Sequence, residues 1–387
     1  MRASTRFAVG LVVALALGCG GSGAADGGGA RADASSGSDA GGADAGGTDA
    51  GGVDAGPPGP PGPWTVYVSV GAESRLAVLS LDEAGSLTER ADDSLDLPGR
   101  PGPQAYDRAR RRLYVGYNAD PPGIATLSLS ATGAATVEGA TPTEEDPVYL
   151  AVADGGRLVS AYFGRDELLV HDVSGAPTHP RLRTLATAEE PHSAAFGPSG
   201  LLYVPHRNGL TTWWLRLRAD GTLDRVGELA AEAGTGPRHI AFHPDGAHAY
   251  IVNEHTESVS THTVGSDGAL TRVETVSALA GGPSDANTAA DVHVTEDGRF
   301  LYSSNRGDDS IARFAIDDEG RLTFLGTTPT EARPREFELT EGGGFLLALG
   351  QDSGALSVYA IGDDGDLTAT GRVELGDNLL WATAIAD

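Results

Sequence analysis

Residues 236–254 read Gly236-Pro-Arg-His-Ile-Ala-Phe-His-Pro-Asp-Gly-Ala-His-Ala-Tyr-Ile-Val-Asn-Glu254. Polar and apolar residues alternate from Arg238 to Phe242, a Pro-Asp-Gly turn follows, and a second apolar run ends at Asn253 and Glu254. This pattern predicts a β-hairpin. Antiparallel pairing places the start of the first strand beside the end of the second. We therefore expect Arg238 and Glu254 to be neighbours at one edge of a sheet.

The second strand of this hairpin has relatives along the whole chain. Seven short apolar runs share its pattern, and they are centred on Tyr67, Tyr114, Val159, Tyr203, Tyr250, Tyr302 and Leu347. Successive centres are 47, 45, 44, 47, 52 and 45 residues apart. Turns with small or acidic residues, most of them containing glycine, recur at a similar period and predict further hairpins between outer strands. A period in the forties, filled with short strands, is typical of a β-propeller.

The ends of the repeat predict how the ring closes. Candidate innermost strands begin near Gln104, Val148, His192, Arg238, Ala290 and Arg335, one fewer than the second strands. The N-terminal run begins directly with a second strand, whereas the C-terminal run 380–386 has no partner after it. We therefore predict an all-β fold, a single seven-bladed β-propeller over residues 64–387. The C-terminal strand would join the N-terminal blade and leave few free sheet edges.

The N-terminus has the features of an export signal. Two arginines, Arg2 and Arg6, precede an apolar run over residues 7–17, which is too short to span a bilayer. Gly18 and Cys19 follow, and the arrangement resembles a bacterial lipoprotein signal. The resemblance implies a signal peptide over residues 1–18 and lipidation of Cys19. The alternative is an ordinary signal peptide with an incidental cysteine.

Residues 19–63 consist almost entirely of Gly, Ala, Asp, Ser and Pro. Such a segment has no apolar surface to offset its ordering entropy, so we predict a disordered tether. The protein would then cross the inner membrane and be lipid-anchored in the bacterial cell envelope, in the periplasm or at the outer membrane. We expect a monomer.

The formal net charge of −27 argues against nucleic acid as a partner, because phosphate binding needs basic patches. We expect no cofactor and no metal. His243, His255 and His262 show no ligand spacing supported by carboxylates, and we predict that they are solvent-exposed.

Alignment of the repeats places charged residues on one rim of the propeller. Blades four to seven supply His192, Arg207, Arg238, Glu254, Arg306, Arg335 and Gln351, whereas blades one to three supply mainly small or neutral residues. Several arginines around one carboxylate suit an anionic, oxygen-rich small molecule, because guanidinium binds carboxylate or phosphate bidentately. A structural ion-pair network is the alternative reading of the same residues.

Several pieces of the chain together resemble the propeller lactonases, the family of bacterial 6-phosphogluconolactonase and fungal carboxy-muconate cyclase. They are Pro191-His192-Ser193, Gly236 to Gly246, Val252-Asn253-Glu254, Ala289 to His293, Ser304 to Gly307, Arg333-Pro334-Arg335 and Leu349-Gly350-Gln351. The resemblance runs from about Trp64 to the C-terminus. It implies catalytic roles for His192, Arg238, Glu254 and Arg306. Residues expected to bind substrate are Arg335, Gln351, His239, His293, Asn253 and Asn305.

The resemblance implies hydrolysis of a sugar or organic-acid lactone with an anionic group. Glu254 would act as general base or orient a water molecule. Arg238 and Arg306 would hold the anion and the developing oxyanion, and His192 would protonate the leaving alkoxide. Arginines around Glu254 should lower its pKa, which weakens it as a base. The alternative function is a non-catalytic envelope propeller that binds an anionic small molecule or a protein.

Overall fold

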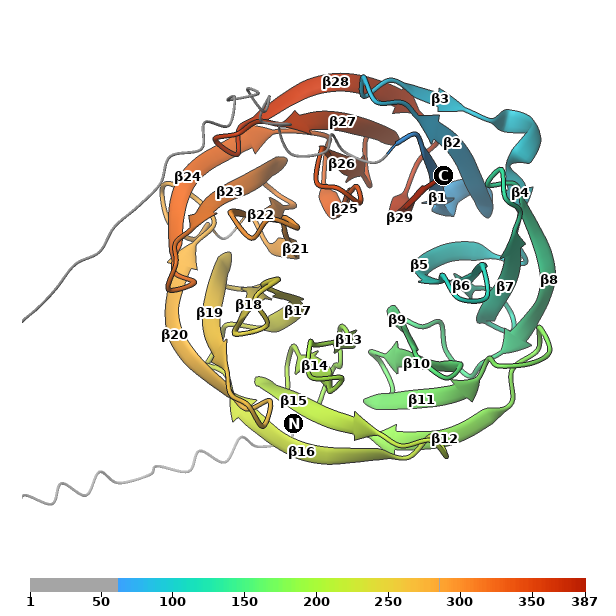
Figure 1. Cartoon of the computed structure of the whole chain (residues 1–387), viewed down its shortest axis with the longest axis horizontal. Coiled ribbons are helices and arrows are strands. Elements are labelled where there is room, and N and C mark those ends of the chain that lie inside the picture. Colours follow the sequence, from blue (N-terminus) through green and yellow to red (C-terminus); the bar gives the residue numbers. More distant parts are fainter. Residues whose placement is uncertain (1–61, 285) are drawn as a thin grey trace, which may run out of the picture. The chain divides into compact units, whose positions relative to one another are not determined.

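The computed structural model describes residues 62–284 and 286–387. In these residues the strands form seven antiparallel sheets, arranged as blades around a central axis (Figure 1). The predicted all-β, seven-bladed propeller is therefore confirmed. The predicted signal peptide, Cys19 and almost all of the predicted tether lie outside the described residues and stay predictions. The described part of the chain contains no helix that is long and apolar enough to cross a membrane.

Each blade has four strand positions, counted from the axis outward. The innermost strands are β29 (Leu379–Ala386), β5 (Arg100–Asp107), β9 (Tyr149–Ala153), β13 (Ala195–Phe196), β17 (Pro237–Phe242), β21 (Ala289–Val294) and β25 (Pro334–Leu339). The second strands are β1 (Trp64–Val70), β6 (Arg112–Asn118), β10 (Arg157–Tyr162), β14 (Leu202–His206), β18 (His248–Asn253), β22 (Phe300–Asn305) and β26 (Phe345–Gly350). The seven predicted centres all lie on these second strands.

The third strands are β2 (Arg75–Leu81), β7 (Gly123–Leu129), β11 (Glu167–Asp172), β15 (Thr211–Leu217), β19 (Ser258–Val264), β23 (Ser310–Ile316) and β27 (Ala355–Ile361). The outer strands are β3 (Leu87–Glu89), β4 (Leu95–Asp96), β8 (Ala135–Pro142), β12 (Arg181–Ala186), β16 (Leu223–Ala230), β20 (Leu270–Ser277), β24 (Leu322–Pro329) and β28 (Leu367–Glu374). Among the described residues, two short 3-10 helices both lie in blade one, at Gly71–Glu73 and Ala91–Asp93.

The ring closes as predicted, because β29 pairs with β1 and completes blade one (Figure 1). Apolar side chains from both ends of the described chain pack in one core that also includes blade seven. Trp64 lies edge to face against Phe345, with 5.7 Å between ring centroids. The hydroxyl of Thr65 donates to the Asp387 carboxylate at 2.7 Å.

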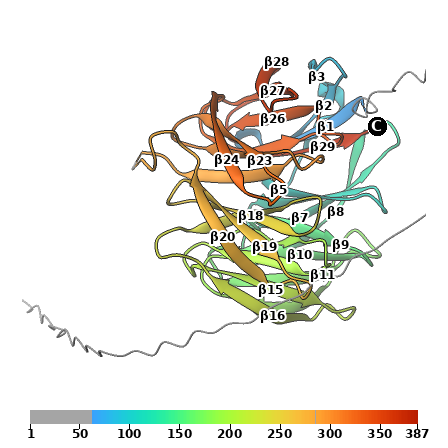
Figure 2. The same cartoon turned by 60° about the vertical axis from the view of Figure 1, so that its left-hand side comes forward.

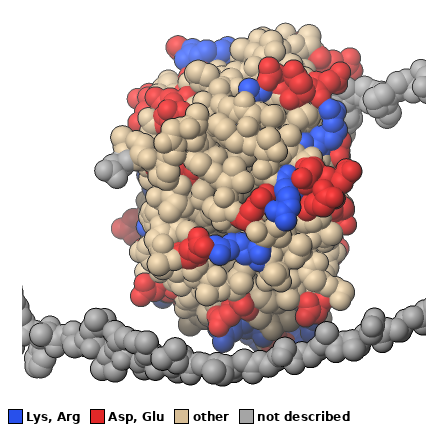
Figure 3. Space-filling model, turned by 90° about the vertical axis from the view of Figure 1, so that its left-hand side faces the viewer, with Lys and Arg blue, Asp and Glu red and all other residues tan. Residues whose placement is uncertain are grey.

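The outer strands wrap the ring, as β20 and β24 do in Figures 1 and 2. Their burial patterns include many exposed positions, as expected of strands that face water. The side shown in Figure 3 carries many carboxylates, with arginines beside several of them. This side of the outer wall therefore carries both signs of charge, often next to each other.

Tyrosines on the second strands join neighbouring blades. The Tyr250 hydroxyl of blade five donates to the carbonyl of Gly320, in the outer hairpin turn of blade six, at 3.0 Å. Tyr203 and Tyr302 make the same contact with the next blade, at 2.8 and 3.0 Å. Tyr114 lacks a glycine carbonyl partner. The reason is that blade three has a long, irregular connection between β11 and β12 in place of the tight glycine turn.

This difference provides a matched stability test. Tyr250→Phe removes a buried hydrogen bond between blades, and we expect it to lower the free energy of unfolding by about 1 kcal/mol. Tyr114→Phe should cost less than half as much, because its hydroxyl has no such carbonyl to lose. Chemical denaturation of the two variants measures the difference. Equal losses would contradict a stabilising role for the contact between blades.

Candidate active site

The innermost strands begin with β-bulges at one end of the central channel. The register of β17 skips Arg238 and His239, and that of β21 skips Ala290 and Asp291. The register of β25 skips Arg335 in a shorter irregularity. A bulge re-aims the residues that it contains. Consecutive residues therefore face the channel here, which strict strand alternation would not allow.

Glu254 lies at the centre of an arginine cluster. Its Oε1 accepts a hydrogen bond from Arg207 Nη1 at 2.9 Å and lies 3.0 Å from Arg306 Nη2. Its Oε2 lies 3.3 Å from Arg238 Nε, which confirms the neighbours predicted from the hairpin. Burial would raise the pKa of Glu254, but Arg238, Arg306 and Arg207 outweigh burial and lower it to about 2. The group is a carboxylate at neutral pH.

The arginines of this cluster have further partners. Arg207 Nε donates to the Glu190 carboxylate at 2.8 Å, and its guanidinium lies over the ring of Phe163. Arg306 Nη2 donates to the Ala289 carbonyl at 3.3 Å. Only 5% of Glu254 is exposed. The cluster is therefore a buried ion-pair network, in which Arg306 Nε has no hydrogen-bond partner among the described residues.

A cavity of about 180 Å³ opens beside this cluster, and we call it the mouth cavity. It is lined by Arg100, Pro101, Gly102, Pro103, Gly116, Tyr117, Asn118, Asp146, Pro147, Val148, Arg238, His239, Arg335, Glu336, Gln351, Leu380 and Trp381. Blades two and three thus contribute Arg100 and Asp146, whose charged atoms are 3.9 Å apart. The other lining residues from the first three blades are uncharged, in agreement with the expectation that these blades supply mainly small or neutral residues.

Two consecutive residues of β25 face the mouth cavity without an intramolecular partner. Among the described residues, neither the Arg335 guanidinium nor the Glu336 carboxyl makes a hydrogen bond or an ion pair. Glu336 is only 3% exposed. Burial raises its pKa well above the ordinary value, and the nearby charge of Asp291 acts in the same direction. Arg335 and Glu336 are thus available to a bound molecule.

A buried hydrogen-bond chain links the arginine cluster to the channel. Arg238 Nη1 lies 3.2 Å from His239 Nε2 and can only donate, so Nε2 accepts. His239 Nδ1 then donates to Asp291 Oδ1 at 2.7 Å. Asp291 Oδ2 lies 3.1 Å from His293 Nε2. Burial, followed by the charge of Arg238, lowers the pKa of His239 to about 4, which keeps its ring neutral.

A second cavity of about 390 Å³ lies farther along the channel. It is lined by Tyr149, Asp291, His293 and Glu338, among others, and it shares His239, Glu336 and Trp381 with the mouth cavity. These three shared side chains lie between the two cavities. Trp381 comes from the closing strand β29 and lies edge to face against Tyr149, with 5.4 Å between ring centroids.

Residues 65–380 match the protein family described as "Lactonase, 7-bladed beta-propeller". The chain belongs to this family. The 6-phosphogluconolactonase of Yersinia pestis (strain Pestoides F) is 32% identical over 285 residues, which cover 71% of this chain and 83% of the relative. That of Pectobacterium carotovorum is 31% identical over 282 residues, with coverage of 71% and 84%. The structure of the periplasmic gluconolactonase of Pseudomonas aeruginosa has the same fold, with a TM-score of 0.77 at 23% identity over 84% of this chain and 99% of that one.

The fold places only some of the residues expected from the lactonase family at the mouth cavity. Arg238, His239, Arg335 and Gln351 line the mouth cavity, whereas Glu254 and Arg306 lie behind it in the ion-pair network. The amide of Gln351 donates to Asn378 Oδ1 at 3.0 Å and leaves its own oxygen unpaired among the described residues.

His192 is buried next to His239, with 5.4 Å between ring centroids. Its Nδ1 has no hydrogen-bond partner in the described part of the chain. Burial lowers its pKa well below the ordinary value, and the charge of Arg238 adds to this effect. The ring is therefore neutral at neutral pH, which suits a hydrogen-bonding role better than donation of a proton.

Asn253 and Asn305 do not reach the mouth cavity. The Asn253 amide donates to Ser258 Oγ at 3.1 Å, and the Asn305 amide donates to Ser310 Oγ at 3.3 Å. These equivalent contacts stabilise the loops of blades five and six. His293 lines the second cavity.

The prediction that His262 is solvent-exposed is wrong, because only 4% of it is accessible. It lies on β19 and lines a small pocket together with residues of blades four and five. His255 is exposed as predicted, and His243 is half-buried.

Glu336, Asp291 and Trp381 were missed by the sequence-based reasoning. Glu336 follows Arg335 directly, so strand alternation assigns the two side chains to opposite faces; the irregular register of β25 removes that alternation. Trp381 stands at the start of the closing strand, where the innermost strands of other blades carry Arg238 or Arg335. Extending the repeat alignment to β29 would have found it.

Proposed function

We propose that this protein hydrolyses a lactone that carries an anionic group, and that the reaction takes place in the mouth cavity. Named relatives of the chain are 6-phosphogluconolactonases. The observation that carries the proposal is the pair Arg335 and Glu336, both without an intramolecular partner at one cavity. A guanidinium suits a carboxylate or phosphate, and a buried carboxyl with a raised pKa suits proton transfer near neutrality.

In the proposed reaction, Glu336 in its ionised form accepts a proton from water as the water oxygen bonds to the lactone carbonyl carbon. Arg238 lines the same cavity and supplies positive charge near the developing oxyanion. When the bond between the carbonyl carbon and the ring oxygen breaks, Glu336 returns the proton to the alkoxide. The product is a hydroxy acid, and Arg335 holds the anionic substituent throughout.

This proposal changes the role expected for Glu254. Both of its oxygens lie against arginines, and its pKa is about 2, so it is a weak base. Glu254 is instead a positioning residue that holds Arg238 at the cavity. His192 packs beside His239 and contributes to the shape and dryness of the site.

The predicted export signal bears on the choice of lactone. An exported protein would meet sugar or organic-acid lactones outside the cytoplasm. The polar walls contributed by Arg100, Asn118, Asp146 and Gln351 suit a hydroxylated ring.

Purified protein should hydrolyse lactones that bear a carboxylate or phosphate better than neutral lactones of the same ring size. Arg335→Ala should raise KM for the anionic lactones about 10–100-fold, the effect of losing a charged hydrogen bond, and leave the neutral ones unchanged. Arg333→Ala is the matched control, because Arg333 is half-exposed and lies 3.9 Å from Asp352. Equal losses on both substrate classes would contradict the role of Arg335. Binding without turnover of any lactone would favour the non-catalytic alternative.

A further inference from the structure

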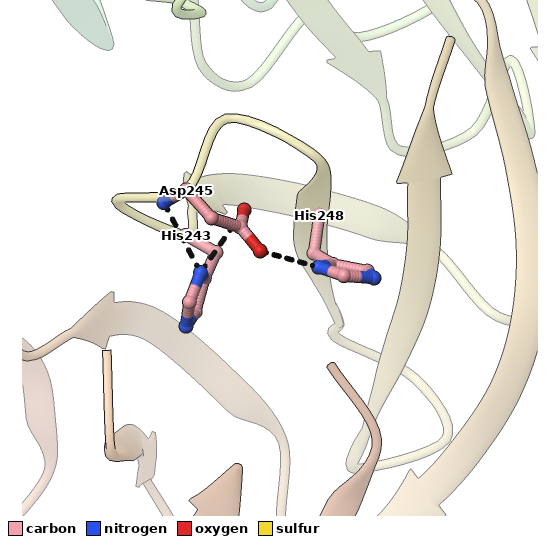
Figure 4. Close-up of side chains that lie close together, drawn as sticks. All are labelled: His243, Asp245 and His248. Carbon is pink, nitrogen blue, oxygen red and sulfur yellow. Dashed lines mark hydrogen bonds and ion pairs between the residues drawn. The ribbon is translucent and has the colours of Figure 1, made fainter. Parts of the chain in front are cut away.

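We propose that the hairpin turn of blade five is a binding site for a divalent transition metal ion such as Zn²⁺. His243, Asp245 and His248 point toward one another there (Figure 4). His243 Nδ1 lies 3.0 Å from Asp245 Oδ1, and His248 Nδ1 lies 2.9 Å from Asp245 Oδ2. The three potential ligand atoms all lie within 4.8 Å of one another. Two imidazoles and a carboxylate are a common ligand set for Zn²⁺.

The protonation of His243 favours a cation at this point. Its Nε2 lies 3.0 Å from the carbonyl oxygen of Gly298, which can only accept, so Nε2 carries a proton. In the neutral ring, the lone pair of Nδ1 then accepts a hydrogen bond from the backbone N–H of Asp245 at 3.2 Å. A metal ion bound here would replace that hydrogen bond and be shared by Nδ1 and Asp245 Oδ1, which lie 3.0 Å apart. A carbonyl that accepts from the far ring nitrogen is also the usual support of a metal-bound imidazole.

The ligands are held in place before any ion binds. His248 packs against the backbone of Gly320 in the outer turn of blade six. Asp245 Oδ1 accepts a hydrogen bond from the backbone N–H of Ala247 at 2.7 Å. The imidazoles of His243 and His248 are 17% and 13% exposed, whereas Asp245 is 38% exposed. The open side leaves room for water as a further ligand.

The channel holds a second group of three possible metal ligands, which differs in the tautomer of its histidine. The group consists of His239, Asp291 and Glu336. Arg238 donates to His239 Nε2, so His239 Nδ1 carries the proton that binds Asp291. That nitrogen has no lone pair for a metal ion. At the hairpin turn, His243 Nδ1 is the unprotonated nitrogen, whereas His248 Nδ1 would release the proton that it donates to Asp245 when an ion binds.

The proposed metal site is independent of lactone hydrolysis. It lies at the turn between β17 and β18, whereas Arg238 and Glu254 lie at the opposite ends of the same two strands. A metal ion there would join the turn of blade five to residues held against blade six. We therefore expect it to stabilise the protein without a direct part in turnover.

Calorimetric titration of the chelator-treated protein with Zn²⁺ at pH 7.5 should show one bound ion per chain, and Zn²⁺ should raise Tm. His248→Gln should weaken binding at least about tenfold and remove the rise in Tm. Asp245→Asn, which keeps the side-chain size, is a second variant in case His248→Gln folds poorly. His255→Gln, at an exposed histidine outside the group, should bind as the wild type does.

Mg²⁺ serves as a further comparison, because it prefers oxygen ligands and should bind at least tenfold more weakly than Zn²⁺. Absence of one-to-one binding would overturn the proposal and assign the group to hydrogen bonding alone. Unchanged Zn²⁺ affinity in both His248→Gln and Asp245→Asn would also overturn it.

Discussion

Replacing Glu336 with glutamine is expected to lower kcat for lactone hydrolysis by about 10²–10⁴-fold, the usual contribution of a positioned acid-base group. Glutamine keeps the size of the side chain but cannot take a proton from water. Affinity for the hydroxy-acid product should change little, because Arg335 still holds the anion. Steady-state kinetics, with calorimetric titration of the product, separate the two effects.

Glu338→Gln is the matched control for this variant. Glu338 lies two residues farther along β25 and lines the second cavity but not the mouth cavity. Burial raises its pKa to about 7, so Glu338, like Glu336, is a carboxyl group with a raised pKa. It differs from Glu336 in that it does not line the mouth cavity. We expect the control to keep most of its activity. Similar losses of kcat in both variants would contradict a specific role for Glu336.

The pH dependence of kcat gives a separate test of Glu336. Water activation needs the ionised carboxylate, so activity should rise with pH through the raised pKa of Glu336. This limb of the profile should disappear in Glu336→Gln. If the limb persists in the variant, the titrating group lies elsewhere.

Glu254→Gln should destabilise the fold strongly, by about 3–5 kcal/mol, because it leaves buried arginines without their carboxylate. Arg238 and Arg306 have side chains that are 2% and 10% exposed. Glu190→Gln is the control, since Glu190 pairs with Arg207 from a position that is 20% exposed and should contribute less than about 1 kcal/mol. Denaturant titration of both variants measures the difference.

Acid titration of stability tests the same cluster. The pKa of Glu254 is about 2 in the folded protein, below its ordinary value of 4.5. Its contribution to stability is therefore complete above pH 4.5 and is lost as the pH falls toward 2. The wild type should lose more stability than Glu254→Gln across this window. Parallel losses in the two proteins would show that Glu254 is not held by the arginines.

Glu254→Gln should also reduce turnover, because Arg238 loses the group that positions it. A stable Glu254→Gln protein with full activity would contradict both the ion-pair network and its role at the cavity. Low kcat together with unchanged stability in Glu336→Gln would show that Glu336 acts in catalysis and does not stabilise the fold.

The seven-bladed architecture could be predicted from the amino-acid sequence alone. The period in the forties, the glycine turns and the unpaired C-terminal run predicted seven blades and their closure, and β29 does pair with β1. These features depend on local physics, because strand alternation and tight turns are encoded within a few residues. The contact between Arg238 and Glu254 belongs to the same class, since both residues lie on one hairpin.

The chemistry of the candidate site depended on the folded ring. Glu254 meets arginines from three different blades, and no pattern within one repeat predicts that both of its oxygens are used. Bulges at the start of β17, β21 and β25 overrode the alternation that assigns each residue to a face. Arg335 and Glu336 face one cavity for that reason. Burial, which raises the pKa of Glu336 and is outweighed by arginines at Glu254, arises only when seven blades pack around one axis.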